Sequence, residues 1–242
     1  MTLQRYAEVS MSREGLRMGT DVFAIPLGMD HCYLIRDKGT IMVDGGAPKK
    51  IREFSRAIEK IGIKADDIQL IIITHGHWDH IGSAKEIKEL TGAKIAMHHL
   101  EKEWLEKSLK PMPPGVTKWG HMLSKIITLF LPLISIPGTS VDIVIENEGR
   151  SLEEYGIPGK IIHTPGHSSG SVSVLLETGE AFVGDMAMNM FPLRFSPGLP
   201  IFAEDLVKLN ESWKSLLDQG AKMIYPSHGA PFSADIIRRA IG

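Results

Sequence analysis

Four residues that can bind metal ions lie within six consecutive positions, in the stretch His75-Gly76-His77-Trp78-Asp79-His80. Neutral imidazoles and carboxylates are protein ligands of zinc, iron and manganese. Because side chains alternate along an extended segment, His75 and His77 should project to the same side. Asp79 and His80 should begin a helix, point elsewhere and serve a second metal. Chance yields this spacing on the order of once in a thousand such chains, so the stretch predicts a metal centre.

Three further candidate ligands come directly after predicted strands. A single histidine in such a place is usually a capping or core residue. Several polar side chains that follow successive buried strands instead indicate one active site along a sheet edge. The three residues are His167, Asp185 and His228, after segments 160–163, 180–183 and 222–225.

The segments that must position these residues show the periods of strands and helices. Short apolar or β-branched runs between turn residues predict strands at 22–26, 32–36, 40–43, 69–74, 94–97, 160–163, 171–176, 180–183 and 222–225. Helical spacing predicts helices at 52–61, 80–90, 203–217 and 234–240. The run 69–74 is almost continuously apolar, which is typical of a strand buried on both faces.

Strands and helices come in two similar rounds, without a repeat at the level of residue identity. The simplest architecture is an α+β fold, an αββα sandwich of two mixed β-sheets flanked by helices. The 242 residues contain no linker, which predicts a single domain over 1–242. Residues 111–141 fit neither round and are predicted to be a helical insertion.

The order of these motifs resembles that of the metallo-β-lactamase superfamily. That family combines an Asp after an early strand, HxHxDH, a His in a TPGH-like turn, an Asp after a strand and a late His. The sequence supplies each of them between about residues 22 and 232, in this order: Asp44, then His75, His77, Asp79 and His80, then His167, Asp185 and His228.

The resemblance implies a ligand set and a mechanism. His75, His77 and His167 would hold one metal, Asp79, His80 and His228 a second, and Asp185 would bridge both. The cofactors expected are two Zn²⁺ per chain, with iron or manganese as alternatives. A metal-bound hydroxide would attack the substrate, and Asp79 would be catalytic as a proton relay to the leaving group. Asp44 would orient the HxHxDH loop.

The insertion has two interpretations. Apolar residues of 122–133 would form a helix that is apolar nearly all round, either a lid over the metals or a helix packed on the sandwich or at a contact between two copies of the chain. An opposing wall of a tolerant apolar pocket is expected from Met186, Met188, Met190, Phe191 and Phe195.

The remaining histidines and the cysteine fit the motifs less well. His98 and His99 are expected to begin a helix, with a pocket position as the alternative. His163 is expected in the core or behind a ligand, and His31 and His121 match no motif. Cys32 is expected to be a small core residue.

The composition limits partners and location. Net charge is −2, with 27 basic and 29 acidic residues, and shows no basic stripe for nucleic acid. The apolar run 122–136 is shorter than the roughly 20 residues of a membrane span, so no membrane partner is expected. A single cysteine and the lack of a signal-peptide pattern favour the cytoplasm. A small-molecule substrate and a homodimer are the partners expected.

Departures from known subfamilies narrow the function. Only 14 residues follow His228, whereas glyoxalase II-type thioesterases carry a further helical region. Met188 stands where typical lactonases place a tyrosine. We expect a hydrolase of an ester, lactone or thioester with a largely apolar pocket. The alternatives are a mononuclear iron persulfide dioxygenase, a phosphodiesterase, a β-lactam hydrolase and a metal-binding sensor.

Overall fold

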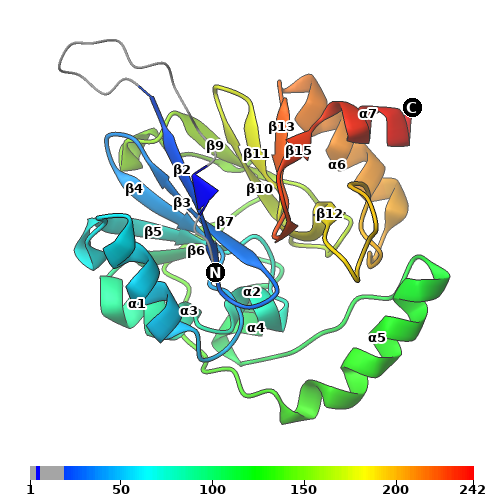
Figure 1. The fold of residues 1–242 in the computed structure, drawn as a ribbon, viewed down its shortest axis with the longest axis horizontal. Coiled ribbons are helices and arrows are strands. Elements are labelled where there is room, and N and C mark those ends of the chain that lie inside the picture. Colours follow the sequence, from blue (N-terminus) through cyan, green and yellow to red (C-terminus); the bar gives the residue numbers. More distant parts are fainter. Residues whose placement is uncertain (1–3, 6–18) are drawn as a thin grey trace.

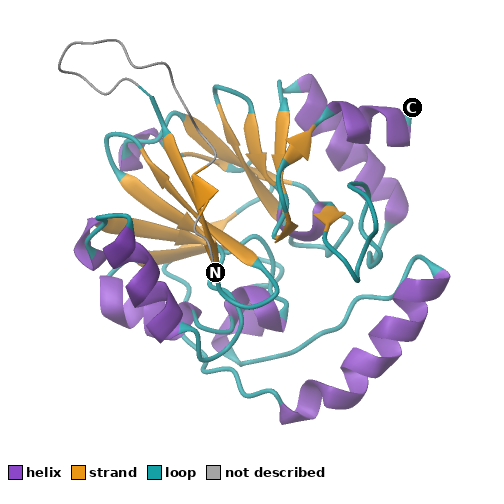
Figure 2. Cartoon of the chain, in the orientation of Figure 1, coloured by secondary structure: helices purple, strands orange, loops and turns teal. Residues whose placement is uncertain are grey.

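The structure is a computed structural model that describes residues 4–5 and 19–242. Two β-sheets lie face to face, and helices cover the outer face of each (Figure 1). Colouring by secondary structure shows the same four layers, with the strands inside and the helices outside (Figure 2). The expected α+β sandwich is therefore confirmed.

The first sheet brings the predicted strands of the N-terminal half together in sequence order. Neighbours are antiparallel from β1 to β4 and parallel from β4 to β7. Parallel strands end at the same edge of a sheet, so the loops that follow β4, β5 and β6 meet there. The strands are β1 (Gln4–Arg5), β2 (Asp21–Pro26), β3 (His31–Arg36), β4 (Thr40–Val43), β5 (Ile68–Ile72), β6 (Lys94–His98) and β7 (Ile143–Ile145).

The second sheet has the order β15-β13-β11-β10-β9-β8, in which only β11 and β13 pair in parallel. A separate parallel pair, β12 (Met188–Asn189) and β14 (His228–Gly229), lies beside it. The strands of the second sheet are β8 (Arg150–Ser151), β9 (Gly159–His163), β10 (Val172–Leu176), β11 (Glu180–Phe182), β13 (Met223–Tyr225) and β15 (Phe232–Ser233).

Alternation along the strands divides the core into layers. In β3, Tyr33 and Ile35 face the second sheet, whereas Cys32 and Leu34 face α1 (Ile51–Lys60) and α3 (Ala84–Thr91). A third core lies between the second sheet and helices α6 (Leu206–Asp218) and α7 (Asp235–Ile241). Cys32 is fully buried, as expected of a small core residue.

One predicted helix, 80–90, is divided in two. The chain forms α2 (Trp78–Ile81), leaves helical geometry at Ser83 and resumes as α3. The Ser83 hydroxyl donates to the Ala47 carbonyl and accepts from the Lys50 N–H. A side chain on Gly82 would also collide with the backbone of Pro48. Contact with the 47–50 loop therefore breaks a segment whose local pattern is continuous.

The insertion contains the expected helix, which begins four residues earlier than its apolar run. It is α5 (Lys118–Phe130), whose N-terminus is capped by the Thr117 hydroxyl, and a 3-10 turn, η2 (Leu131–Leu133), follows it. Elements that the sequence did not predict are α4 (Lys102–Glu106), the short strands β1, β7, β8, β12, β14 and β15, and the turns η1 (Ala65–Asp67), η3 (Glu153–Tyr155) and η4 (Gly184–Met186). Within residues 4–5 and 19–242, no helix has the length and apolarity needed to cross a bilayer.

Candidate metal centre

The seven candidate ligands meet at the edge where the central strands of both sheets end. His75, His77, Asp79 and His80 come from the loop after β5 and the start of α2. His167 lies in the loop between β9 and β10, Asp185 in η4 after β11, and His228 in β14. All except the partly exposed Asp79 are buried. The structure thus brings together residues that are up to about 150 positions apart in the sequence.

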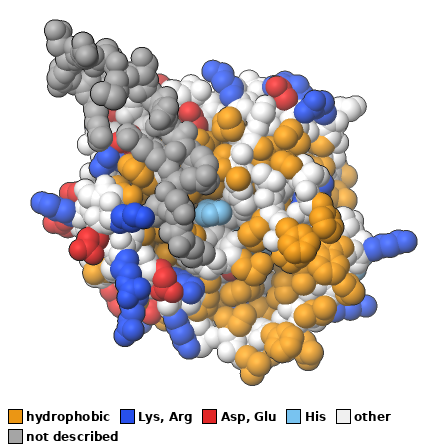
Figure 3. All heavy atoms as spheres, in the orientation of Figure 1, with side chains coloured by type: hydrophobic (Ala, Val, Ile, Leu, Met, Phe, Trp, Pro, Cys, Tyr) orange, Lys and Arg blue, Asp and Glu red, His pale blue; other side chains and the backbone are white. Residues whose placement is uncertain are grey.

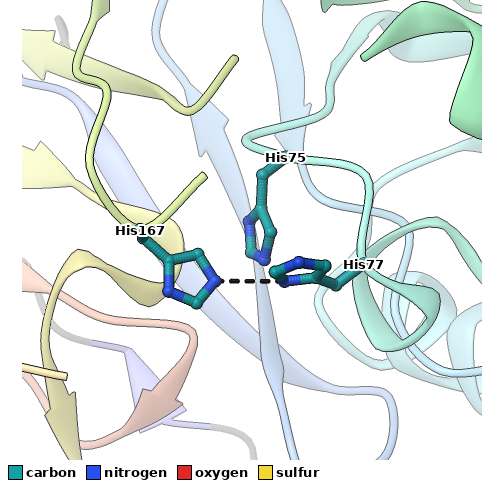
Figure 4. Close-up of side chains that lie close together, drawn as sticks. All are labelled: His75, His77 and His167. Atoms are coloured by element: carbon teal, nitrogen blue, oxygen red, sulfur yellow. Dashed lines mark hydrogen bonds between the residues drawn. The ribbon is translucent and has the colours of Figure 1, made fainter. Parts of the chain in front are cut away.

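One group consists of three histidines. A nitrogen of each of His75, His77 and His167 lies within 4.8 Å of the other two (Figure 4). His77 Nδ1 and His167 Nε2 are 3.0 Å apart. Two nitrogens bound to one tetrahedral zinc at about 2.0–2.1 Å lie roughly 3.3 Å apart. The three imidazoles could therefore share a metal ion after a small outward movement.

A second group consists of Asp79, His80 and His228, whose candidate ligand atoms also lie within 4.8 Å of one another. Asp185 lies between the two groups. Its Oδ1 is 3.4 Å from His80 Nε2 and 3.3 Å from His228 Nε2, while its Oδ2 is 3.8 Å from His167 Nε2. One carboxylate therefore faces both groups, as a ligand shared by two metals would.

The hydrogen bonding in the described part of the chain indicates that a cation belongs here. Buried polar atoms are nearly always paired, yet His75 Nε2, His77 Nε2, His80 Nε2 and Asp185 Oδ1 have no hydrogen-bond partner. Imidazole nitrogens and a carboxylate oxygen that lack hydrogen bonds, gathered in one cluster of candidate ligands, fit divalent metal ions.

The first group stays neutral over a wide pH range. Burial, followed by the neighbouring His167, lowers the pKa of His77 to about 3. Burial also lowers the pKa of His75, well below its usual value, and that of His167. A metal binds the neutral form of imidazole, so these three side chains do not have to lose a proton first at neutral pH.

The second group is a set of opposite charges. Burial raises the pKa of Asp185, but His228 and His80 outweigh burial and hold it well below its usual range. Burial lowers the pKa of His80 and of His228, but Asp185 outweighs burial in both and raises it well above its usual value. A divalent cation among these carboxylates would replace the positive charge of the imidazolium protons.

Asp44 holds the HxHxDH loop in place, as expected. Its buried carboxylate accepts the Thr74 N–H at 2.8 Å, the Thr74 hydroxyl and the Ser227 hydroxyl at 3.0 Å. It also accepts His80 Nδ1–H at 2.9 Å, which directs Nε2 of that ring to Asp185. Asp44 has a φ of 63°, a left-handed conformation that Asp adopts more readily than most residues.

A carbonyl group orients His167. Because an oxygen of this kind can only accept, the 2.9 Å contact with Phe202 O requires a proton on His167 Nδ1 and leaves the Nε2 lone pair for a metal. Phe202 packs with Met188, Leu193 and Ile201 beneath α5. The insertion thus contacts the segment that fixes this imidazole.

Comparison with known proteins decides the family. The profile of the metallo-beta-lactamase superfamily matches residues 25–228. The chain belongs to the metallo-beta-lactamase superfamily. It is 30% identical over 209 residues to the metallo-beta-lactamase fold-containing protein ST1585 of Sulfurisphaera tokodaii. The matched residues make up 83% of this chain and 72% of that protein. It is 28% identical over 172 residues to the hydroxyacylglutathione hydrolase GloC of Haemophilus influenzae, over 70% of this chain and 72% of GloC.

Solved structures agree with this assignment. The archaeal superfamily protein ST1585 from Sulfolobus tokodaii superposes with a TM-score of 0.67 at 25% identity, over 91% of this chain and 84% of that one. The BLEG-1 B3 metallo-beta-lactamase gives a TM-score of 0.64 at 20% identity, over 88% and 93%, and shares the fold. The chain is therefore a member of a metallo-hydrolase superfamily, with His and Asp groups that could bind divalent metal.

Two residues that support the HxHxDH loop of this metallo-beta-lactamase fold were missed from the sequence. The buried Glu101 carboxylate accepts the Gly76 N–H at 2.7 Å and the Gly170 N–H at 2.6 Å, so it joins the loops of His75 and His167. The Trp104 ring stacks on His77 at 6.1 Å and fills the space that a side chain on Gly76 would need. Neither residue has a sequence signal, because α4 is only five residues long.

We expect Glu101→Gln to weaken metal binding by roughly 10–100-fold, the usual effect of losing a partner that orients a ligand. An amide has one carbonyl oxygen, so its NH₂ group must face one of the two N–H donors. Competition with a chelator measures the affinity, and the absorption spectrum of the Co²⁺ form reports ligand geometry.

Glu103→Gln is the matched control for Glu101→Gln. The exposed Glu103 lies two residues further along and pairs with Lys107 at 2.8 Å. It should leave both readouts unchanged. An unaltered Co²⁺ spectrum and affinity in Glu101→Gln would show that the carboxylate does not position the two loops.

The remaining histidines of interest form a separate cluster outside the metal groups. His98 ends β6 and does not begin a helix, because α4 starts at Lys102. Its ring stacks on His163 at 4.1 Å, and its Nε2 is 3.2 Å from Asn147 Oδ1. His99 pairs with Glu146 at 2.9 Å. Neither His98 nor His99 belongs to a described group that could hold a metal.

His98 should make the fold sensitive to acid. Burial, with His163 next in size, lowers its pKa from 6.5 to about 4, so between these pH values the unfolded chain binds more protons at this residue than the folded chain does. Stability contributed by neutral His98 is present above pH 6.5 and is lost as pH falls towards 4. We expect His98→Gln to lose urea resistance less steeply over this range than wild type.

His121→Gln, on the exposed side of α5, is the control for this measurement and should follow the wild-type slope. Parallel curves for all three proteins would contradict the assignment of the acid sensitivity to His98.

The loop before β3 also approaches the second group without having been predicted to do so. The backbone N–H of His31 donates to Ser227 O at 2.7 Å. Burial, and to a smaller extent the nearby His228, lower the pKa of the His31 imidazole. Burial raises the pKa of Asp30 to about 7, although His80 and His228 act against it. The loop before β3 and the first residue of that strand therefore add two titratable side chains, Asp30 and His31, that no sequence motif indicated.

Proposed function

We propose that the chain is a binuclear metal-dependent hydrolase that cleaves an ester, lactone or thioester bond. The observation that carries the proposal is the position of Asp185, whose two carboxylate oxygens face His80 and His228 on one side and His167 on the other. A carboxylate so placed, between two buried sets of ligands, suits a pair of metal ions better than a single one.

The proposed ligands follow from the two groups. His75, His77 and His167 would hold one metal, Asp79, His80 and His228 the other, and Asp185 both. Zinc suits this set, and iron or manganese would also be accepted. When bound, the metals supply a nucleophile at neutral pH and polarise the substrate carbonyl.

Protein groups would orient the ligands, exclude water and transfer a proton. Asp44 and the Phe202 carbonyl orient His80 and His167, and burial of both groups excludes bulk water. Asp79 is 3.5 Å from His228 and keeps a lowered pKa, because His228 and His80 outweigh the effect of burial. It is therefore an ionised carboxylate at neutral pH, suited to take up a proton and pass it to the leaving group.

The substrate class rests on two observations. The relative from Haemophilus influenzae is named a hydroxyacylglutathione hydrolase, which supports an acyl thioester. The apolar insertion packs on the segment that precedes Phe202, which supports an apolar acyl group near the metals. Met186 and Met188 lie in the core and do not form an open pocket wall, whereas Phe191 and Phe195 are exposed. Closure of the insertion over the metals stays a prediction.

The test compares bond types on the purified, metal-loaded chain. S-acylglutathiones, aryl esters and lactones of equal acyl length are assayed beside a β-lactam and a phosphodiester, with metal content measured on the same sample. We expect turnover of an acyl substrate, its loss in chelator and its return with zinc. Cleavage of the phosphodiester or β-lactam alone would overturn the substrate class. A single iron, with oxygen uptake on adding persulfide, would overturn the hydrolase assignment.

A further inference from the structure

The exposed side of α5 and the loop after β12 form an apolar surface that contains no candidate ligand. We name it the α5 surface. Figure 3 shows hydrophobic side chains gathered over α5 and the loop beside β12, with basic side chains at the edge. Large exposed apolar areas usually mark a binding surface. Its members are 40–91% exposed: Trp119, Met122, Ile126, Leu129, Phe130, Leu133, Phe191 and Phe195.

The helix and the loop form one continuous surface. Trp119 Nε1 donates to the carbonyl of Pro192 at 3.0 Å, and the rings of Phe191 and Phe195 are 5.4 Å apart. Below them, Leu123 and Ile127 pack against Met188, Leu193, Ile201 and Phe202, which anchors the helix to the body of the protein. The exposed side chains are thus held outward by a fixed helix.

The charged residues of the segment that carries α5 have one sign, and within the described part of the chain only Lys107 at its start pairs with a carboxylate, that of Glu103. Segment 107–141 contains four lysines and no Asp or Glu, although the whole chain has a net charge of −2. Lys110 binds the carbonyls of Leu131 and Ile134. Lys118 and Lys125 are exposed, and the 3.6-residue period places them along the strip next to Met122 and Leu129.

We propose that the α5 surface binds the interface of an anionic lipid bilayer. Apolar side chains with tryptophan and phenylalanine on one side, and lysines at the border, are the features of a helix that lies in the plane of a membrane surface. The apolar side chains would enter the acyl region while the lysine stems extend their ammonium groups to anionic headgroups. This contact needs no span, so the absence of a spanning helix in the described residues does not oppose it.

A second copy of the chain fits the surface less well. Two copies related by a twofold axis would place the same surface against itself. Lys118 and Lys125 of both copies would then enter one interface, and segment 107–141 offers no carboxylate to pair with them. Anionic headgroups supply the missing opposite charge.

The experiment is co-sedimentation of the full chain with vesicles of phosphatidylcholine alone or with about one third phosphatidylglycerol. It uses no substrate, so its outcome is independent of the proposed hydrolysis. We expect binding to the anionic vesicles that weakens as salt rises. A lysine near such a surface strengthens binding about fivefold, so the double variant K118Q/K125Q should bind roughly 25-fold more weakly. Leu129→Glu, at a side chain 73% exposed, should abolish binding.

Leu90→Glu is the control, because Leu90 is 45% exposed on α3, which packs beside α1 on the outer face of the first sheet. It should bind as wild type does, and equal melting temperatures should show that all variants are folded. No binding to anionic vesicles, or equal binding of wild type and Leu129→Glu, would overturn the proposal. A dimer on a sizing column that Leu129→Glu dissociates, without vesicle binding, would assign the surface to a second copy.

Discussion

Replacing Asp185 with alanine should abolish hydrolysis and lower the metal content together. The carboxylate lies within 3.3–3.8 Å of nitrogens of His228, His80 and His167. Without it, the histidines of both groups lose their shared anionic partner and would face two cations with only Asp79 as a charged ligand. We expect activity to fall below detection and bound metal to drop from about two ions per chain, measured by elemental analysis on the assayed sample.

Asp205→Ala is the control for this loss. Asp205 caps α6 by accepting the N–H groups of Val207 and Lys208, so its removal should lower stability by about 1 kcal/mol and leave metal content unchanged. An Asp185→Ala protein that keeps two metals would remove this residue from the proposed ligand set.

Asp79→Asn is expected to separate catalysis from metal binding. An asparagine keeps the size of the side chain and one potential ligand oxygen, but it cannot accept a proton at neutral pH. We expect a metal-loaded variant to lose turnover by about 10²-fold or more, the range for a missing general acid–base group. Rates are compared after dialysis against equal concentrations of zinc, with metal content determined on each sample.

The pH profile adds an independent check on Asp79. The pKa of this carboxyl is lowered because His228 and His80 outweigh burial, so wild-type activity should decline on the acid side as Asp79 becomes protonated. In Asp79→Asn, the part of the acid-side decline that comes from protonation of Asp79 should be absent. Full activity in metal-loaded Asp79→Asn would exclude Asp79 as a proton carrier, and loss of metal would make it a ligand alone.

Much of the fold could be predicted because its signals are local. Strand β5 is a short apolar run, and a strand buried on both faces needs little else to be recognised. The candidate ligands follow such runs directly, which is why the sequence predicted that they meet, although it did not show that they come from the ends of strands in two different sheets. Buried strands that end in polar loops therefore allowed both the fold class and the candidate ligands to be predicted from the sequence.

What could not be predicted depends on contacts between distant segments. The break at Ser83 arises from the 47–50 loop, and the role of Glu101 arises from two N–H groups, of which Gly170 lies 69 positions away. The pairing of Met188 with His228 joins strands of two residues each, too short for a period to show. None of these contacts produces a pattern in the sequence next to Ser83, Glu101 or Met188.

The insertion is not a detachable module. Val116 N–H donates to Ile201 O at 2.8 Å and Ala203 N–H donates to Pro114 O at 3.1 Å, on either side of the residue whose carbonyl holds the His167 ring. Exchanging residues 111–141 for the insertion of another member of the family would change the outer surface. It would also disturb the Phe202 carbonyl, and with it the tautomer and orientation of the His167 imidazole. A graft joined beyond this pair of hydrogen bonds, from Thr117 onward, would keep both of them and would also need apolar residues in place of Leu123 and Ile127, which pack on Phe202.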